Sequence, residues 1–189
     1  MREAFNRISP LSETDWLYLN THVETVHLKG RDILLQIGQV ENYLYFINEG
    51  LLRFYIKKDE REISLDFVEQ KQIFCSFISY VGRMPSEVCI QALVPATVYR
   101  IHFDVVEKLL DESKCYERFA RLLVGSLYLR KLQKEINLLT RSAEENYASI
   151  LLETPQVVKD IPVKDMASYL GIHPDSLSRI RRKLIRTKL

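Results

Sequence analysis

The sequence predicts an α+β fold in three parts: an N-terminal antiparallel β-roll of the jelly-roll type, a long dimerisation helix and a C-terminal all-α helix-turn-helix. Three observations lead to this prediction. Short β-branched and aromatic runs recur about every ten residues between positions 23 and 103. One long segment, 116–139, carries apolar residues in a heptad pattern. The final segment, 161–189, holds two helical patterns separated by a glycine.

The composition is that of a globular protein with one or two domains, since 47% of the 189 residues are hydrophobic. No apolar run approaches the roughly 18 residues that a membrane span needs, and the N-terminus lacks the apolar core of a secretory signal. We therefore expect a cytoplasmic protein without a membrane partner. Cys75, Cys89 and Cys115 are odd in number and widely spaced. This pattern favours buried free thiols over disulfides or a metal site.

The first elements are a short helix and a series of strands. Ser12 is a good N-cap for a helix over 13–20, and Leu11 with Trp16 has the spacing of a hydrophobic staple. Turn formers separate the strands, and the absence of a long helix between them disfavours a parallel sheet. The predicted strands are 23–28, 32–36, 43–48, 51–57, 62–67, 87–93 and 97–101.

The segment 74–86 interrupts this series because it does not alternate and contains Gly82 and Pro85. We expect a short helix followed by a loop, packed against the roll by Phe74, Phe77 and Tyr80. Such an insertion can hold a small ligand, and a plain structural crossover explains it equally well. The candidate effector pocket comprises Phe74, Cys75, Ser76, Pro85, Ser86 and Glu87.

After a short amphipathic helix, 103–110, the long helix carries two apolar stripes. One stripe, Phe119, Leu123 and Leu127 with Tyr128 beside it, would pack on the roll. The other has heptad spacing, so we expect it to join the same helix of a second subunit. Burial of both stripes within one chain is the alternative. The heptad seam comprises Leu122, Gly125, Leu129, Leu132, Ile136 and Leu139.

The C-terminal segment is punctuated by helix caps. Ser142 and Glu145 have the spacing of a capping box, and Thr154-Pro155 ends the helix that they begin. Further on, Gly171 can end a helix in the left-handed conformation, and Pro174 can open the next one. The result is a helix-turn-helix.

The second helix of this pair has the residues of a DNA-reading helix. An arginine can bond to guanine, and Asp175 can accept from a cytosine amino group. Asp175, Ser176 and Arg179 are expected to face bases, and Arg181, Arg182 and Lys183 are phosphate or packing candidates. The predicted DNA-binding residues are His173, Pro174, Asp175, Ser176, Arg179, Arg182 and Lys183.

Positive charge is confined to the same end of the chain. Residues 179–189 hold six basic and no acidic side chains, so with a net charge of +2 overall, residues 1–178 carry −4. A basic cluster suits phosphates, although such a run by itself is as often a solvated tail. The helix, glycine and helix that precede it favour DNA binding. The basic residues are Arg179, Arg181, Arg182, Lys183, Arg186 and Lys188.

The order of these elements resembles the Crp/Fnr superfamily of bacterial transcription regulators, most closely the branch common in Bacteroidetes. The resemblance covers essentially the whole chain. It implies a cyclic-nucleotide-binding-like effector domain over 1–115, a dimerisation helix over 116–140 and a DNA-binding domain over 141–189. It also implies a homodimer on pseudo-palindromic double-stranded DNA, with RNA polymerase as a further partner and Pro174, Asp175 and Arg179 at bases. It is carried by residues 44–53, 85–87, 90–93, 142–147, 167–172 and 176–181.

The sequence departs from the family pattern in three ways. Members that bind cyclic AMP have a Gly-Glu pair for the ribose and an arginine for the phosphate, where this chain has Cys75-Ser76 and Ser86; Lys131-Leu132 replaces the polar pair for adenine. A cyclic phosphate without a cation is poorly held, so we expect the effector, if one binds, to be another small molecule. The clustered N-terminal cysteines of oxygen-sensing members are missing. The chain ends at Leu189 without a β-hairpin wing, so the recognition helix and the dimer are expected to carry more of the affinity.

The sequence leaves two other functions as alternatives. A small-molecule or protein-binding sensor with a vestigial DNA-binding end is the main alternative. An enzyme is disfavoured because His22, His27, His102 and His173 are scattered, and the acids are expected to pair with bases along exposed faces. Residues 60–62 have the character of a solvated hairpin tip. No catalytic residue, cofactor or metal is predicted.

Overall fold

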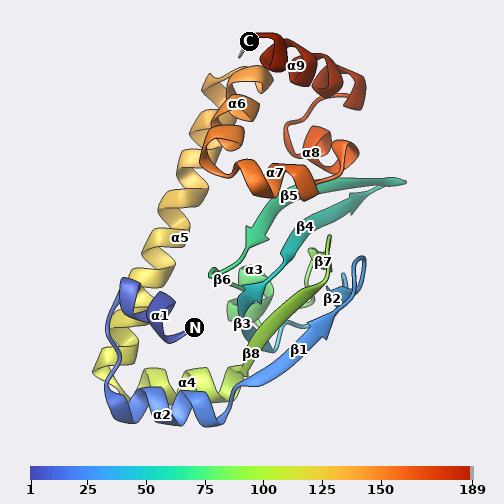
Figure 1. Ribbon diagram of the computed structural model, residues 1–189. Coiled ribbons are helices and arrows are strands. Elements are labelled where there is room, and N and C mark those ends of the chain that lie inside the picture. The colour runs from blue at the N-terminus through green and yellow to red at the C-terminus, as the bar shows by residue number, and fades with distance from the viewer. Residues whose placement is uncertain (188–189) are drawn as a thin grey trace.

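The computed structural model describes the backbone of residues 1–187 and the side chains of residues 1–184. Figure 1 shows a β-roll, a long helix α5 (Lys114–Thr140) along one side of the molecule, and a cluster of short helices at the C-terminal end. The N-terminal helices lie at the opposite end of α5 from this cluster. The predicted α+β architecture is confirmed.

The roll consists of two four-stranded antiparallel sheets, with strand orders β1-β8-β3-β6 and β2-β7-β4-β5. The chain changes sheet between β2 and β3 and again between β3 and β4, as expected of a jelly roll. The strands are β1 (Glu24–Leu28), β2 (Ile33–Leu35), β3 (Tyr43–Glu49), β4 (Leu51–Lys58), β5 (Arg61–Glu69), β6 (Ile73–Phe74), β7 (Cys89–Ala92) and β8 (Ala96–His102).

Apolar side chains from the two sheets fill the roll. Ile47 and Val98 from one sheet and Leu52 and Ile90 from the other are fully buried in a common cluster. The corner between β3 and β4 depends on Gly50, whose φ is +104° and where a Cβ would lie 2.5 Å from the Cβ of Ala96. Only glycine fits such a position, so it lets the chain pass from one sheet to the other within one residue.

A second core forms where helices cover the N-terminal half of α5. These are α1 (Arg2–Ile8), α2 (Glu13–Thr21) and α4 (Phe103–Glu112). The ring of Phe119 is buried and stacks on Phe5 with centroids 4.7 Å apart. The side chain of Ser12 accepts from the amide of Asp15, so the predicted cap of α2 is confirmed.

The inner stripe of α5 lies where the sequence predicts it, except for one residue. Phe119 and Leu123 are buried, and Leu127 packs against the same core. Tyr128 is 66% exposed, so its predicted place in this stripe is wrong. One residue after Leu127 turns the helix by about 100°, which points Tyr128 away from the core. Among the described residues, no helix, α5 included, is long and apolar enough to cross a membrane.

The C-terminal cluster contains α6 (Ala143–Glu153), α7 (Pro155–Asp160), α8 (Val163–Tyr169) and α9 (Pro174–Thr187). The predicted capping box of α6 is present, because the Ser142 hydroxyl accepts from the Glu145 amide and the Glu145 carboxylate accepts from the Ser142 amide. Thr154 ends α6 as predicted. Pro155 then opens α7, where its missing N–H costs little.

Three short elements were not predicted: α1, β6 and α7. Between β6 and β7 the expected helix is α3 (Phe77–Gly82), with Tyr80 buried as predicted. Phe77 is 44% exposed, so it does not anchor the helix to the roll. The three cysteines are free thiols, but Cys115 is exposed and Cys75 is only half-buried, against the expectation that all are buried.

Candidate nucleic-acid interface

The turn between α8 and α9 is built by local backbone hydrogen bonds. Gly171 has a φ of +68°, and its amide donates to the carbonyl of Ser168 at 3.2 Å. The amide of Ile172 donates to the carbonyl of Ala167 at 3.0 Å. This pair of bonds is a Schellman motif, which ends α8 and fixes the direction in which the chain leaves it. At the start of α9, Nδ1 of His173 accepts from the amide of Asp175 at 3.3 Å.

Helix α9 has one apolar face and one polar face. On the apolar face Leu177 is fully buried, and Ile180 and Leu184 pack around it in the same cluster as Met166 of α8. The polar face points away from α8. Its first turn carries Asp175, and the basic residues follow further along the helix.

All seven predicted DNA-binding residues have described side chains. His173, Asp175, Arg179, Arg182 and Lys183 are exposed, and Pro174 and Ser176 are half-buried. Lys183 also bonds to the carboxylate of Glu144 on α6 at 2.8 Å. Of the other basic residues, Arg181 turns inward, with its guanidinium 5.5 Å from the ring centre of Tyr147, which supports a packing role. The side chains of Arg186 and Lys188 lie outside the described residues.

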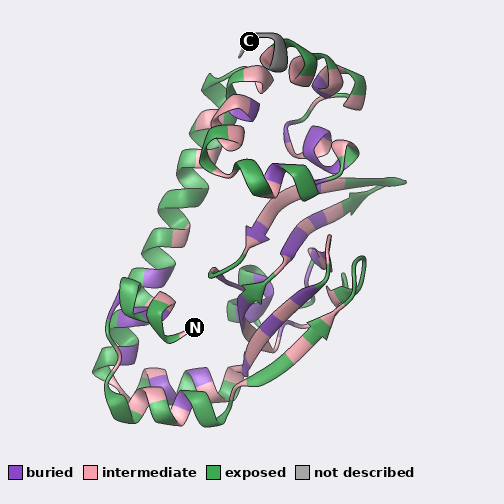
Figure 2. Cartoon of the chain, in the orientation of Figure 1, coloured by how far each residue is buried: buried purple, intermediate pink, exposed green. Residues whose placement is uncertain are grey.

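The outer stripe of α5 lies open in the single chain. Figure 2 shows mostly exposed residues along α5 beyond its packed N-terminal part. A Cβ at Gly125 would meet no atom within 4 Å. This exposure rules out the alternative in which both stripes of α5 are buried within one chain. The five large seam residues are all exposed: Leu122, Leu129, Leu132, Ile136 and Leu139.

The candidate effector pocket is only partly assembled from the predicted residues. Phe74, Ser76 and Ser86 are buried and Cys75 is half-buried, whereas Pro85 and Glu87 are exposed. The hydroxyls of Ser76 and Ser86 lie 2.7 Å apart and share a hydrogen bond. The ring of Phe74 stacks on Tyr45 with centroids 5.2 Å apart. Two residues of the predicted pocket, Ser76 and Ser86, therefore bond to each other across the segment between β6 and β7.

A buried carboxylate beside this region was missed by the sequence analysis. Glu41 is fully buried, and its carboxylate accepts from the amide of Tyr43 at 3.1 Å, the hydroxyl of Tyr45 at 3.0 Å and the amide of Ser76 at 3.3 Å. Burial raises the pKa of Glu41, and these hydrogen bonds partly oppose the rise. Burial likewise raises the pKa of the Cys75 thiol. The expectation that acidic residues pair with bases on exposed faces is wrong for Glu41.

The helix pair rests on the roll through a second set of residues that the sequence analysis missed. Arg53 of β4 is buried and bonds to Asp165 of α8 at 2.5 Å. The hydroxyl of Ser168 accepts from the amide of Ser64 at 3.0 Å and donates to the carbonyl of Glu62 at 3.1 Å. The pairs are separated by more than a hundred residues, so no local sequence signal links them.

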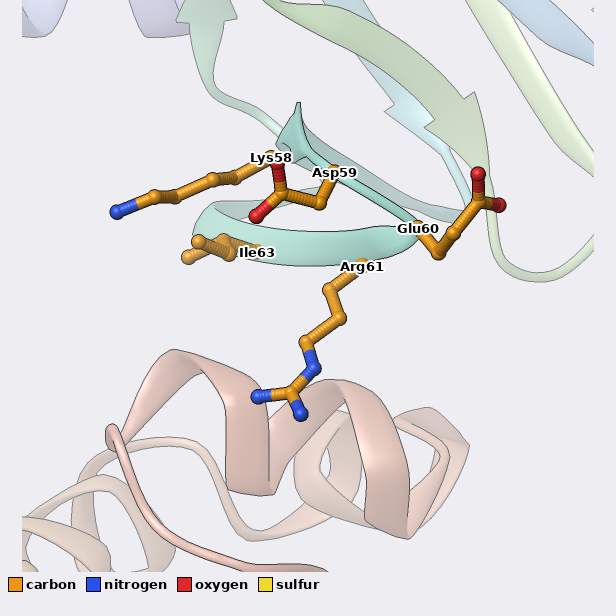
Figure 3. A pocket seen from close by; sticks show the side chains of 5 residues that line it. All are labelled: Lys58, Asp59, Glu60, Arg61 and Ile63. Carbon is orange, nitrogen blue, oxygen red and sulfur yellow. The ribbon is translucent and has the colours of Figure 1, made fainter.

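A hollow at the tip of the β4–β5 hairpin lies away from the predicted effector pocket. Figure 3 shows Arg61 pointing from the hairpin toward the C-terminal helices and Lys58 pointing to one side of the hairpin. The hollow is open and mostly charged, which agrees with a solvated hairpin tip. Its lining residues are Lys58, Asp59, Glu60, Arg61 and Ile63.

The β-roll matches a known domain family. Residues 25–113, from β1 to the end of α4, match the cyclic nucleotide-binding domain. Together, the fold and the C-terminal helix pair define a class of protein in which a roll of this type is joined by a long helix to a helix-turn-helix. No curated protein matches the sequence.

Solved structures extend the comparison to the whole chain. A protein of Eubacterium rectale assigned to the Crp/Fnr family of transcriptional regulators is 22% identical, with a TM-score of 0.73 over 94% of this chain and 85% of that one. FixK2 from Bradyrhizobium japonicum is 20% identical, with a TM-score of 0.72 over 88% and 86%. The c-di-GMP responsive regulator CLP from Xanthomonas campestris is 14% identical, with a TM-score of 0.71 over 94% of each chain. The chain therefore has the Crp/Fnr fold that the sequence predicted.

Proposed function

We propose that this chain is a DNA-binding transcription regulator of the Crp/Fnr type, which acts as a homodimer and reads a pseudo-palindromic operator. The geometry of α9 carries the proposal. Its apolar face is buried against α8, while its polar face, with Asp175, Arg179 and Arg182, is open to a ligand. A helix presented in this way by a short, fixed turn suits the major groove of DNA.

The residues on α9 divide by role. Arg179 lies in the first half of the helix and would fork onto a guanine, with Pro174, Asp175 and Ser176 at neighbouring bases. Arg182 lies further along the exposed face and would contact phosphate. Lys183 would contact phosphate too, although its bond to Glu144 must then be exchanged for one to DNA.

The exposed seam of α5 supports a dimer. Its leucine and isoleucine side chains repeat with heptad spacing along a helix of 27 residues, and Gly125 would allow close approach of two backbones. A two-fold dimer would place two copies of α9 on successive major grooves. RNA polymerase is a further proposed partner in the cytoplasm.

The proposed effector is a small molecule other than cyclic AMP. Ser76 and Ser86, which stand where cyclic AMP-binding members have acidic and basic ligands, bond to each other, and the buried carboxyl of Glu41 lies beside them. A cyclic phosphate there would meet an acid rather than a cation. CLP, which is c-di-GMP responsive, has the same fold, so this architecture is compatible with effectors of different chemistry.

The proposal is tested by selecting an operator from random DNA and measuring affinity by fluorescence anisotropy. We expect Arg179→Ala to lose about 1–3 kcal/mol on the selected site and to relax specificity at one base pair per half-site, because a bidentate contact to a base is removed. Arg182→Ala, a matched exposed arginine on the same helix, should weaken binding to selected and random DNA alike and should reduce the salt dependence.

Two further comparisons complete this experiment. Cyclic AMP should leave the affinity of the unmodified protein for its operator unchanged. Equal losses on selected and random DNA for Arg179→Ala would contradict the base-reading role. If selection enriches no sequence at all, the sensor with a vestigial DNA-binding end is the better description.

A further inference from the structure

We infer that Arg53, together with Asp165, is a positioning residue for DNA binding, which sets the half-site spacing that the dimer prefers. This inference rests on the proposed function. It concerns the contact between the roll and α8, where a buried ion pair joins elements that are 112 residues apart in the chain.

Arg53 is held in one orientation from several sides. It is 2% exposed, and its two terminal nitrogens donate to Asp165 at 2.5 Å and to Glu62 at 2.5 Å, with Gln91 at 3.2 Å. Its guanidinium also lies 4.2 Å from the ring centre of Tyr55. Since a guanidinium is planar and donates in fixed directions, its bond to Asp165 specifies where α8 lies relative to β4 and the neighbouring β5.

Other contacts reinforce the same contact surface. Ser168 bridges two backbone groups of β5, and the rings of Phe67 and Tyr169 lie 5.2 Å apart. Lys134 of α5 lies 3.8 Å from the ring centre of Tyr169 and donates to the carbonyl of Leu65. These contacts connect α5, β5 and α8 through Lys134, Leu65 and Tyr169. Figure 1 shows α8 beside the β4–β5 hairpin.

The apolar and polar parts of this contact have different effects. Leu51 of β4 is buried in the same cluster as Met166 and Leu177. This apolar burial holds the helix pair α8–α9 against the roll, but because it is non-directional it does not fix the angle between them. A buried ion pair adds little net stability compared with apolar residues of similar size, but it is directional. If the ion pair is removed and the apolar contact is kept, α8 should therefore stay packed against the roll, but its orientation on the roll should vary more.

The orientation of α8 determines that of α9. The Schellman turn at Gly171 and the shared apolar cluster join the two helices into one unit. In a dimer, any tilt of this unit changes the distance and angle between the two copies of α9. DNA offers successive major grooves about 34 Å apart, and one added base pair moves a half-site by about 3.4 Å and turns it by about 35°. A fixed orientation therefore selects one spacing.

The test uses the full chain and an apolar replacement of the ion pair, Arg53→Met with Asp165→Leu. Affinity is measured on the selected operator, on operators with one or two base pairs added or removed between half-sites, and on a single half-site. The control is Arg100→Gln, which breaks an arginine–carboxylate pair between β8 and β1, away from the helix pair.

The unmodified protein and the control should lose affinity on the order of tenfold when the spacing changes by one base pair, because DNA or protein must then deform. The double variant should bind the altered spacings within about twofold of the original one, with its affinity for a single half-site unchanged. Hydrogen exchange at the Ser64 amide, which donates to Ser168, should be faster in the double variant than in the control.

A folded double variant that keeps the spacing preference of the unmodified protein would overturn the inference while leaving the proposed function intact. If the double variant does not fold, the single variant Asp165→Ala decides, because it removes both acceptor oxygens of residue 165 while Arg53 keeps its bond to Glu62. It should broaden the spacing preference, and an unchanged profile would refute the inference. Loss of sequence-specific binding in the unmodified protein would instead refute the proposed function.

Discussion

At the scale of single residues, Glu41 is an ionisable group buried inside the roll. Glu41 has no exposed surface, and three donors converge on its carboxylate. Two of the donors belong to β3 and the third is Ser76, which precedes α3. Glu41 therefore links these two segments beside the predicted effector pocket. Its environment makes it sensitive to pH.

Replacing Glu41 by Gln should change how stability depends on pH. Burial raises the pKa of Glu41 above its ordinary value of 4.5, so in the window just above pH 4.5 the folded chain keeps a proton that the unfolded chain loses. The contribution of Glu41 to stability is therefore present below pH 4.5 and is lost as pH rises through its folded pKa. Within that window, the free energy of unfolding of the unmodified protein should fall as pH rises, by up to about 1.4 kcal/mol per pH unit relative to that of Glu41→Gln.

Urea unfolding between pH 4.5 and 7 checks this prediction, and Glu60→Gln at the exposed hairpin tip controls for the change of charge. A difference between Glu41→Gln and the unmodified protein that does not vary with pH would show that the folded chain tolerates the ionised carboxylate.

At the scale of elements, α5 has one packed face and one exposed apolar face. Its first half packs Phe119 and Leu123 into the helical core, while the seam of Leu129 and Ile136 remains uncovered. An exposed apolar stripe with heptad spacing is stabilised when a second helix buries it, which is the contact that the proposed dimer would make.

Leu129→Glu should separate the proposed dimer. Burying a leucine contributes about 1.5–3 kcal/mol, and each dimer holds two copies, so the dissociation constant should rise at least about a hundredfold. Tyr128→Glu is a matched control, since Tyr128 is 66% exposed and Leu129 is 65% exposed, but only Leu129 lies on the seam. Sedimentation equilibrium measures both. Equal association of the two variants would place the dimer contact elsewhere.

At the scale of the whole molecule, the helix pair does not have a core of its own. The apolar cluster around Met166 and Leu177 includes Leu51 from the roll, with Phe67 and Leu93 packed at its edge. The domain boundary predicted near residue 140 is therefore not a boundary in the packing, because residues from both sides of it share one apolar cluster.

Leu51→Ala should destabilise the whole chain by about 2–5 kcal/mol in a single unfolding transition. The fluorescence of Trp16, which reports on the helical core near the N-terminus, and the far-ultraviolet circular dichroism should shift together. Leu152→Ala is the control because Leu152 is 73% exposed, and it should change stability by less than about 0.5 kcal/mol. Two separate transitions in Leu51→Ala would mean that the helix pair unfolds independently.

The sequence predicted the features that depend on neighbouring residues. The capping box at Ser142, the turn at Gly171 and the strand pattern follow from local preferences, and each is present. The structure also leaves the predicted face of α9 open. The sequence did not predict α1, which is held by the stacking of Phe5 on Phe119. Nor did it predict β6, whose two residues are too few to show a periodic pattern.

Contacts between distant parts of the chain were beyond sequence reasoning for a physical reason. Arg53 and Asp165 look like ordinary charged residues in a strand and a helix, because burial is a property of the assembled fold. The same holds for Glu41. For the candidate site, the sequence thus identified the exposed polar face of α9, but it did not identify the residues that hold α8 and α9 in place.

The participation of Leu51 and Arg53 in the C-terminal cluster has a consequence for protein engineering. Residues 141–189, transplanted onto an unrelated scaffold, would lack the arginine that pairs with Asp165 and the leucine that completes the apolar cluster. A functional chimera would therefore have to carry the β4–β5 hairpin with it, or supply both groups from the recipient.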